Sequence, residues 1–155
     1  MAARKPIRLV SACMTGTPCR YNGQAKPDPR VIRLVEHQEA IAVCPEMLGG
    51  LSTPRRPAEI VGGDGDDVLD GKARVIDDSG QDVTEAFLAG AHQALKLAQA
   101  AGAREAILKE FSPSCGCATI YDGTFSGKRQ AGTGVTAALL RRYGIVVRSE
   151  LALEE

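Results

Sequence analysis

Three short apolar runs, each followed by a cysteine, constrain the fold of this chain more than any other feature of its sequence. They occupy residues 7–12, 40–43 and 106–108, and the cysteines that follow them are Cys13, Cys44 and Cys115. Apolar runs of this length, bounded by stretches rich in Gly, Pro and polar residues, are typical of buried β-strands. We therefore expect three strands that each deliver a cysteine to the loop beyond their carboxyl end.

Helical patterns separate these strands. Asp28-Pro29 provides an N-cap followed by proline at the first helical position, which predicts a helix to about residue 38. Residues 82–85 have the spacing of a capping box and precede apolar residues at helical spacing. This pattern predicts a second helix, which ends at Gly102.

The predicted fold is a single Rossmann-like α/β domain over residues 1–155, because a chain of this length is too short for two ordinary domains. A last helix over residues 135–143 leads into a strand over 145–148, so that strands alternate with helices. This order implies a mostly parallel sheet with right-handed crossovers. Residues 58–61 and 73–76 are expected to form a small hairpin excursion.

Sheets of this kind bind their ligands outside the carboxyl ends of the strands. Cys13, Cys44 and Cys115 are therefore expected to converge on one crevice, although each one alone is equally compatible with a small buried apolar side chain. The loop over residues 109–117, which carries Cys115, is rich in polar and small residues, so we expect it to lie outside the core.

The charge balance restricts the class of partner. The sequence has 19 basic and 19 acidic residues, so it lacks the positive field that attracts duplex nucleic acid or an anionic membrane. A small-molecule partner fits this balance better. No apolar run is long enough for a signal peptide or a membrane span, and we expect a cytoplasmic protein. Because cytosolic thiols stay reduced, the five cysteines indicate metal binding or catalysis rather than disulfides.

Cysteine thiolates prefer soft metals and iron–sulfur clusters, whereas hard cations prefer oxygen ligands. Three thiolate ligands would leave one metal position open to a substrate atom. Cys19 and Cys117 each share a loop with another cysteine, so they are secondary candidates, with Cys19 a possible ligand.

Other residues near the cysteines are candidates for proton transfer and substrate binding. Glu46 follows Cys44 by two positions, and an extended backbone before Pro45 would place both side chains on the same side. A carboxylate there can act as a general acid or base, although a solvated surface glutamate explains it equally well. Ser112 and Ser114 can hydrogen-bond a small heterocycle or simply form a turn.

Aromatic residues are a weaker signal. Tyr121 and Phe125 can stack on a ring or belong to a structural turn. Both histidines, His37 and His92, fall within predicted helices, which leaves no histidine for a catalytic triad or a zinc site. Residues 132–134 precede the last helix and are a minor candidate for anion binding, because no phosphate-loop or dinucleotide fingerprint is present.

Several motifs occur in an order that resembles the thiouracil desulfidase family. They are Ser11-Ala12-Cys13, Cys19-Arg20-Tyr21-Asn22-Gly23, Cys44-Pro45-Glu46-Met47-Leu48-Gly49-Gly50, Ser112-Pro113-Ser114-Cys115-Gly116, Ile120-Tyr121-Asp122-Gly123-Thr124-Phe125-Ser126-Gly127 and Gly134-Val135-Thr136-Ala137. The resemblance implies a [4Fe-4S] cluster held by three cysteines. It also implies that the free iron captures the sulfur of a thiocarbonyl, which water then replaces without net redox change.

Carried onto this chain, the resemblance implies that Cys13, Cys44 and Cys115 are the ligands. It likewise makes Glu46 the proton-transfer residue and gives Ser112 a role in holding the ring, whereas Cys117 departs from the usual pattern. The expected substrate is 2-thiouracil or a related thiolated nucleobase or thioamide, which gives the carbonyl product and sulfide. Two alternatives remain open: a non-catalytic iron–sulfur or zinc-binding module, and a zinc hydrolase.

Overall fold

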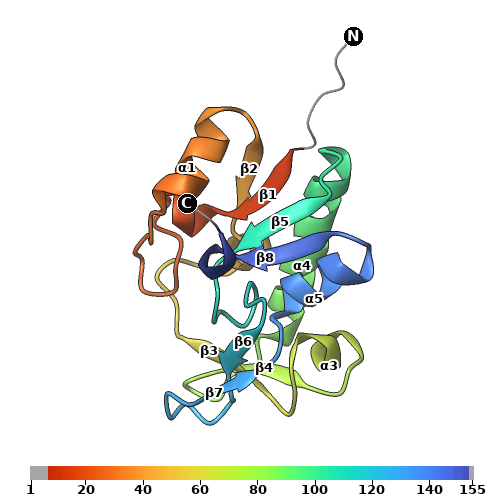
Figure 1. Cartoon of the computed structure of the whole chain (residues 1–155). Helices are drawn as coiled ribbons and strands as arrows, with labels where there is room; N and C mark the ends of the chain where they lie inside the picture. Colours follow the sequence, from red (N-terminus) through yellow and green to blue (C-terminus); the bar gives the residue numbers. More distant parts are fainter. Residues whose placement is uncertain (1–6, 154–155) are drawn as a thin grey trace.

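A four-stranded parallel sheet forms the centre of the computed structural model, which describes residues 7–153 (Figure 1). Its strands, in spatial order, are β2 (Ala40–Val43), β1 (Arg8–Ser11), β5 (Glu105–Leu108) and β8 (Val146–Ser149). Every neighbouring pair runs parallel, which confirms the predicted sheet. The register places Ser11 opposite Val43 and Leu108 opposite Ser149, so the strands end at one edge.

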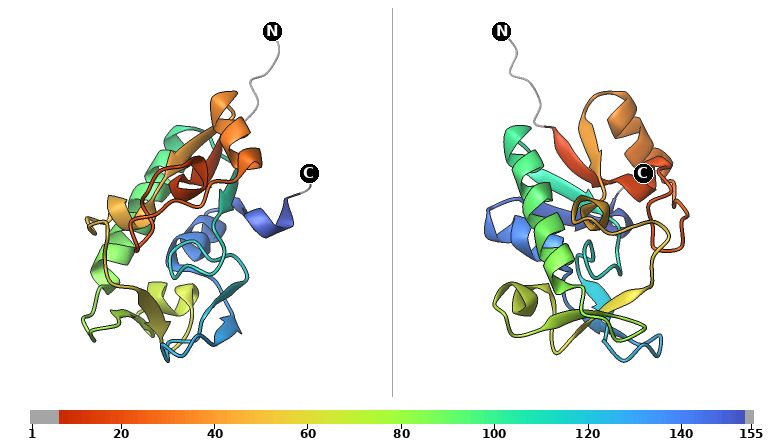
Figure 2. Two further views of the ribbon diagram at one scale, coloured as in Figure 1. Left: turned by 90° about the vertical axis from the view of Figure 1, so that its left-hand side faces the viewer. Right: turned by 180° about the vertical axis from the view of Figure 1, so that it is seen from behind.

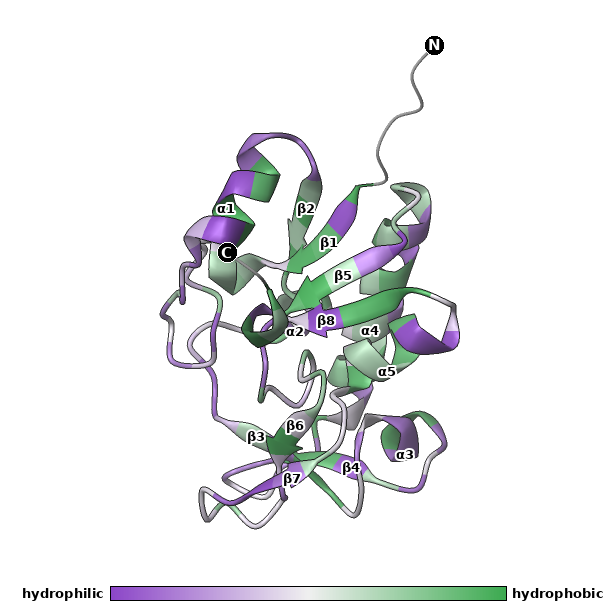
Figure 3. Cartoon of the chain, in the orientation of Figure 1, coloured by the Kyte–Doolittle hydropathy of each residue, from purple (hydrophilic) through white to green (hydrophobic). Residues whose placement is uncertain are grey.

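The sheet is apolar on both faces, which explains why its strands appear in the sequence as continuous apolar runs. Leu9 and Leu108 belong to a core cluster with residues of two helices, α4 (Thr84–Ala100) and α5 (Val135–Arg142). Their neighbours Val10 and Ile107 belong to a second cluster, on the side of α1 (Pro29–Glu36). Figure 2 shows α4 and α5 on one side of the sheet and α1 on the other. Figure 3 shows apolar residues along the strands.

The structure tests the predicted N-terminal caps of two helices. The side chain of Asp28 accepts a hydrogen bond from the backbone N–H of Arg30 at 2.9 Å, which confirms the predicted N-cap of α1. The predicted capping box of α4 forms only in part: the N-cap is Val83, which makes no side-chain capping bond, but the side chain of Asp82 accepts a hydrogen bond from the N–H of Thr84 at 2.9 Å. The hydroxyl of Thr84 accepts a hydrogen bond from the N–H of Val75, on the neighbouring strand β4 (Arg74–Asp77).

A smaller lobe lies below the sheet in the view of Figure 1. Strand β3 (Ala58–Val61) pairs antiparallel with β4, which confirms the predicted excursion, and helix α3 (Gly65–Leu69) connects them. A second antiparallel pair, β6 (Thr119–Tyr121) and β7 (Arg129–Ala131), was not predicted, because these three-residue strands have no apolar run of their own.

Short helical turns begin just beyond three strands of the sheet. The 3-10 turn η1 (Ala12–Thr15) follows β1, and helix α2 (Pro45–Leu48) follows β2 after Cys44. A last 3-10 turn, η2 (Glu150–Ala152), follows β8. Among residues 7–153, no helix combines the length and the apolar character that crossing a bilayer requires.

Two glycines let α2 approach α4 at backbone distance. A Cβ atom at Gly90 would overlap the carbonyl oxygen of Pro45, and a Cβ atom at Gly49 would overlap that of Ala86. Because α2 carries Glu46 and begins directly after Cys44, this close contact fixes both residues relative to the sheet.

We predict that Gly90→Ala lowers the free energy of unfolding by about 2 kcal/mol, although alanine favours a helix by about 1 kcal/mol. The added methyl group meets backbone atoms, which cannot move aside as a side chain can. Urea unfolding measures the change, with the exposed helical position Gln93→Ala as the control. A Gly90→Ala protein as stable as the wild type would contradict the tight contact between the helices.

Candidate metal centre

A cavity of about 680 Å³ opens beyond the carboxyl ends of the strands. Its wall includes four of the five cysteines, namely Cys13, Cys19, Cys44 and Cys115. The fifth, Cys117, is buried outside the cavity. The structure therefore brings together thiol groups from three separate segments of the chain, as the strand ends predict.

Each strand end presents its cysteine through a different local structure. Cys13 lies in η1, and Cys44 is the N-cap of α2 with extended backbone angles of φ −119° and ψ 102°. This extended conformation agrees with the restriction that Pro45 imposes on the preceding residue. Cys115 lies in the loop after β5, and Cys19 lies in the loop between η1 and α1.

Cys19 lies between two of the other thiols. A hydrogen bond with the side chain of Cys13 raises the pKa of Cys19 to about 11. A hydrogen bond with Cys19, together with burial, raises the pKa of Cys44 as well. Burial raises the pKa of Cys115. These thiols are therefore neutral at physiological pH, and metal binding would displace their protons.

Several thiols on one cavity wall are a donor set that fits an iron–sulfur cluster. Within residues 7–153, no three His, Cys, Asp or Glu side chains are close enough together to hold one ion. A multi-iron cluster takes each thiolate on a different iron, so its ligands must stand around a space rather than at one point. No histidine lines the cavity, which disfavours the common catalytic zinc sites.

Glu46 lines the same cavity from the first turn of α2, with 15% of its side chain exposed. Its oxygen Oε2 accepts a hydrogen bond of 2.7 Å from Nε of Arg55, with which it forms an ion pair. Sequence reasoning missed Arg55, because a basic residue in a loop rich in Gly and Pro carries no distinguishing spacing.

The two predicted serines lie in different surroundings. Ser112 lines the cavity, and its hydroxyl oxygen accepts hydrogen bonds from the N–H groups of Ser114 and Cys115, at 3.0 and 2.8 Å. These bonds are the turn that the alternative interpretation expects. Among residues 7–153, no acceptor is bonded to the hydroxyl hydrogen of Ser112. Ser114 lies outside the cavity wall, where its buried hydroxyl bonds the hydroxyl of Thr136 at 3.0 Å.

Only one of the two aromatic candidates lies on the cavity wall. Tyr121 lines the cavity, whereas Phe125 does not and is 40% exposed. A third aromatic residue, Phe111, lines the cavity and was missed. The guanidinium of Arg129 lies 3.9 Å from the centre of its ring. Because an isolated phenylalanine in a polar loop resembles any other apolar residue, only the structure identifies it as part of the wall.

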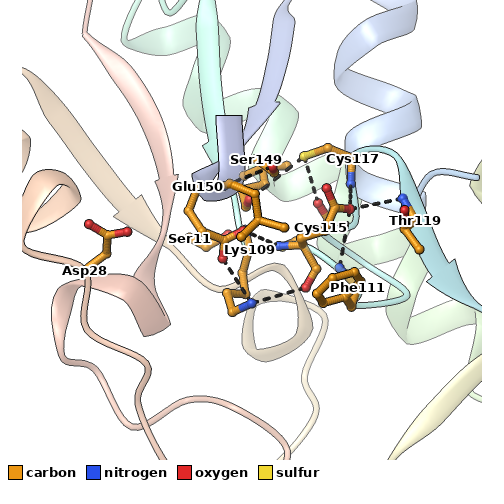
Figure 4. Close-up of polar contacts among 12 residues, drawn as sticks. Ser11, Asp28, Lys109, Phe111, Cys115, Cys117, Thr119, Ser149 and Glu150 are labelled. Atoms are coloured by element: carbon orange, nitrogen blue, oxygen red, sulfur yellow. Dashed lines mark hydrogen bonds and ion pairs between the residues drawn. The ribbon is translucent and has the colours of Figure 1, made fainter. Parts of the chain in front are cut away.

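The loop that carries Cys115 is buried, contrary to the expectation from its polar composition. Its buried residues include Glu110, Ser114, Cys115 and Cys117. The carboxylate of Glu110 accepts hydrogen bonds from the N–H groups of Cys117, Ala118 and Thr119, at 2.7, 3.1 and 3.2 Å. The N–H of Phe111 donates to the same carboxylate oxygen at 3.4 Å, and Figure 4 shows the dashed lines that leave Cys117, Thr119 and Phe111.

These bonds explain why a carboxylate is tolerated in the interior. Burial alone would raise the pKa of Glu110, but the backbone N–H donors outweigh burial and lower it. Sequence reasoning missed Glu110, because its partners are backbone N–H groups, which every residue type except proline carries. The same neighbourhood, chiefly burial and then the charge of Glu110, raises the pKa of Cys117 to about 12.

The beginning of α5 completes the fold of this loop. The N–H groups of Val135 and Thr136 donate to the carbonyl oxygens of Pro113 and Ser114, at 2.8 and 2.9 Å. The N–H groups of Gly132 and Gly134 likewise donate to the carbonyl oxygens of Ala118 and Gly116, at 2.9 and 2.8 Å, so these groups are not free to bind an anion. The helix end binds the carbonyl groups of the cysteine loop instead.

The chain has relatives that are similar along nearly its whole length. A family model described as 2-thiouracil desulfurase matches residues 9–152. The uncharacterised protein YbbK of Bacillus subtilis (strain 168) is 52% identical over 147 residues, which cover 95% of this chain and 97% of that protein. The solved structure of the [4Fe-4S]-dependent thiouracil desulfidase TudS superposes with a TM-score of 0.85 at 48% identity, covering 96% of this chain and 93% of that chain.

We predict that Glu110→Gln lowers the free energy of unfolding by about 2 kcal/mol at pH 7, because charge-assisted bonds to the loop backbone are weakened. The lowered pKa of Glu110 stabilises the fold above the ordinary glutamate value of 4.5, and this contribution is lost as the pH falls below it. The difference in the free energy of unfolding between wild type and Glu110→Gln should therefore shrink as the pH falls from about 5 to about 3, the range in which glutamate titrates.

Urea unfolding across this pH range measures the effect, with Glu36→Gln on the exposed face of α1 as the control. The control should change the free energy of unfolding by less than about 0.5 kcal/mol. A pH-independent difference for Glu110→Gln would show that its carboxylate charge does not hold the loop.

Proposed function

This chain belongs to the 2-thiouracil desulfurase family, and from that membership we propose that it exchanges the thiocarbonyl sulfur of a thiolated heterocycle for the oxygen of water. It is an iron–sulfur-dependent desulfidase, and its cofactor is a [4Fe-4S] cluster. For 2-thiouracil the balanced reaction consumes one water and yields uracil and hydrogen sulfide, with no net oxidation or reduction.

One observation supports this proposal above the others: thiols from three strand ends share one cavity wall with Glu46. We assign Cys13, Cys44 and Cys115 as the ligands, so that one iron carries no protein ligand. When bound, the cluster supplies a soft Lewis acid that accepts the sulfur of the substrate in preference to an oxygen and makes sulfide a better leaving group.

The residues of the chain position the substrate and move protons. Oε1 of Glu46 takes a proton from the attacking water and returns one to the departing sulfur, which is the ordinary work of a general acid and base. The unused hydroxyl hydrogen of Ser112 donates to an acceptor atom of the ring. Phe111 and Tyr121 offer apolar ring faces at the same wall. We give no substrate contact to Ser114 or Phe125, because neither lines the cavity.

We further propose that residues 1–155 form one desulfidase domain that works in the cytoplasm on a small thiolated nucleobase or thioamide. All five cysteines are free, which suits a reducing compartment. The formal net charge of zero offers no general attraction to duplex nucleic acid or to a membrane.

We predict that the cluster-loaded wild type releases sulfide and the oxo product from at least one thiolated pyrimidine, whereas Glu46→Gln lowers kcat by about 10²–10⁴-fold. Glutamine keeps the shape of the side chain but cannot accept and return the proton. The assay is anaerobic incubation with a panel of thiolated pyrimidines, followed by measurement of sulfide and the oxo product, with Glu36→Gln as the control.

Iron content and visible absorbance should be the same in wild type and Glu46→Gln. Normal turnover by Glu46→Gln would remove its assigned role. A wild-type protein that holds its cluster but releases sulfide from no compound on the panel would favour a non-catalytic iron–sulfur module, and a colourless zinc-loaded protein would favour a hydrolase.

We predict that Cys19→Ala retains the cluster and that Cys115→Ala loses it, because three thiolates are sufficient and Cys19 is not among those assigned. The measurements are iron and acid-labile sulfide per chain and visible absorbance after anaerobic reconstitution. Both cysteines are buried on the same wall, so the pair controls for a general effect of removing a thiol. Loss of the absorbance in Cys19→Ala would place Cys19 in the ligand set.

A further inference from the structure

Arg55 is an unusually enclosed cation. Only 9% of its side chain is exposed, whereas arginine side chains are almost never buried without partners. It lies on the cavity wall, in the segment between α2 and β3. Its backbone N–H donates to the carbonyl oxygen of Tyr21 at 2.7 Å, which ties this segment to the loop that carries Cys19.

The guanidinium bonds to Glu46 are asymmetric. Nε donates to Oε2 of Glu46 at 2.7 Å, and Nη2 forms an ion pair with the same oxygen. Within the part of the chain that the structure describes, no donor bonds Oε1 of Glu46. One oxygen of the carboxylate is thus anchored, and the other is left to exchange a proton.

The remaining donors of Arg55 bind the surrounding loops. Nη2 also donates to the carbonyl oxygen of Cys19 at 2.9 Å, and the thiol of Cys44 lies 3.7 Å from this same oxygen. Nη1 donates to the carbonyl oxygen of Ser52 at 3.1 Å and to the hydroxyl of Thr53 at 3.0 Å. One planar group therefore connects Glu46 to the backbone beside the thiols.

We propose that Arg55 is the positioning residue of this site, which holds Oε2 of Glu46 so that Oε1 meets the substrate in one fixed place. This inference rests on the proposed desulfidase function. A lysine cannot substitute, because its ammonium group is a point charge, whereas the rigid fork of arginine reaches the carboxylate and both loops at once. In this role Arg55 acts through Glu46 and not on the reacting atoms.

The test compares Arg55→Lys and Arg55→Ala with the same substitutions at Arg74. Arg74 is a suitable control, because it forms an ion pair with Asp82 at the exposed surface and does not line the cavity. We expect both Arg55 variants to lower kcat by about 10–100-fold, as the loss of a supporting contact in a catalytic site typically does. KM should change by less than about threefold, because no substrate contact is lost.

Two readouts do not depend on turnover. Iron and acid-labile sulfide per chain should equal those of the wild type, because Arg55 bonds no thiol side chain. Substrate binding to the cluster-loaded Arg55→Ala protein is measured by the change in visible absorbance. Its Kd for the thiolated substrate should lie within about threefold of the Kd of the Glu46→Gln protein. A purely structural role would instead lower cluster content and substrate binding along with kcat.

Addition of guanidinium ion to the Arg55→Ala protein tests the positioning role directly. We expect it to raise kcat of Arg55→Ala by about tenfold or more, since a free guanidinium can occupy the space and bond Oε2. Sodium chloride at the same ionic strength should not do so, and neither ion should raise kcat of Glu46→Gln. Rescue of Arg55→Ala by guanidinium supports the positioning role even where Arg55→Lys is poorly folded.

The proposal is overturned if Arg55→Lys turns over like the wild type, if only KM changes, or if activity falls only in proportion to cluster content. In those cases the active wild type still supports the desulfidase function. A cluster-loaded wild type that is inactive toward the whole panel overturns both proposals together.

Discussion

The parallel register of the sheet is the constraint on which the site depends. Because β1, β2 and β5 run in the same direction and end at one edge, residues beyond their ends must lie close together. Thiols that are distant in the sequence thereby reach a common wall without a short metal-binding motif. The helices cover both faces of the sheet, so the candidate site lies at this edge.

The loop after β5 shows how a polar segment can form one side of that wall. Its backbone N–H groups are bound by the carboxylate of Glu110, and its carbonyl groups by the start of α5. Lys109 and Glu150 add an ion pair of 3.0 Å at its base. With its backbone groups paired in this way, the loop is buried without the cost of unsatisfied polar atoms, and Cys115 is held in place.

The opposite side of the wall is organised by charge rather than by backbone pairing. Glu46 and Arg55 form a largely enclosed ion pair, and the directional bonds of the guanidinium give the two carboxylate oxygens different surroundings. Soft thiols and one polarised carboxylate therefore face the same space. This combination suits a reaction in which sulfur leaves a carbon atom and a proton follows it.

The sequence by itself determined the parallel sheet, the cap of α1 at Asp28 and the convergence of Cys13, Cys44 and Cys115. These features follow from local patterns, namely apolar runs, capping residues and the positions of cysteines after strands. Only the tertiary structure decided that the hydroxyl of Thr84 bonds strand β4, that the loop of Cys115 is buried, and that Arg55, Glu110 and Phe111 belong to the site. The physical reason is that their partners are backbone groups, or side chains beyond the range of a local sequence pattern, which come into contact only when the chain has folded.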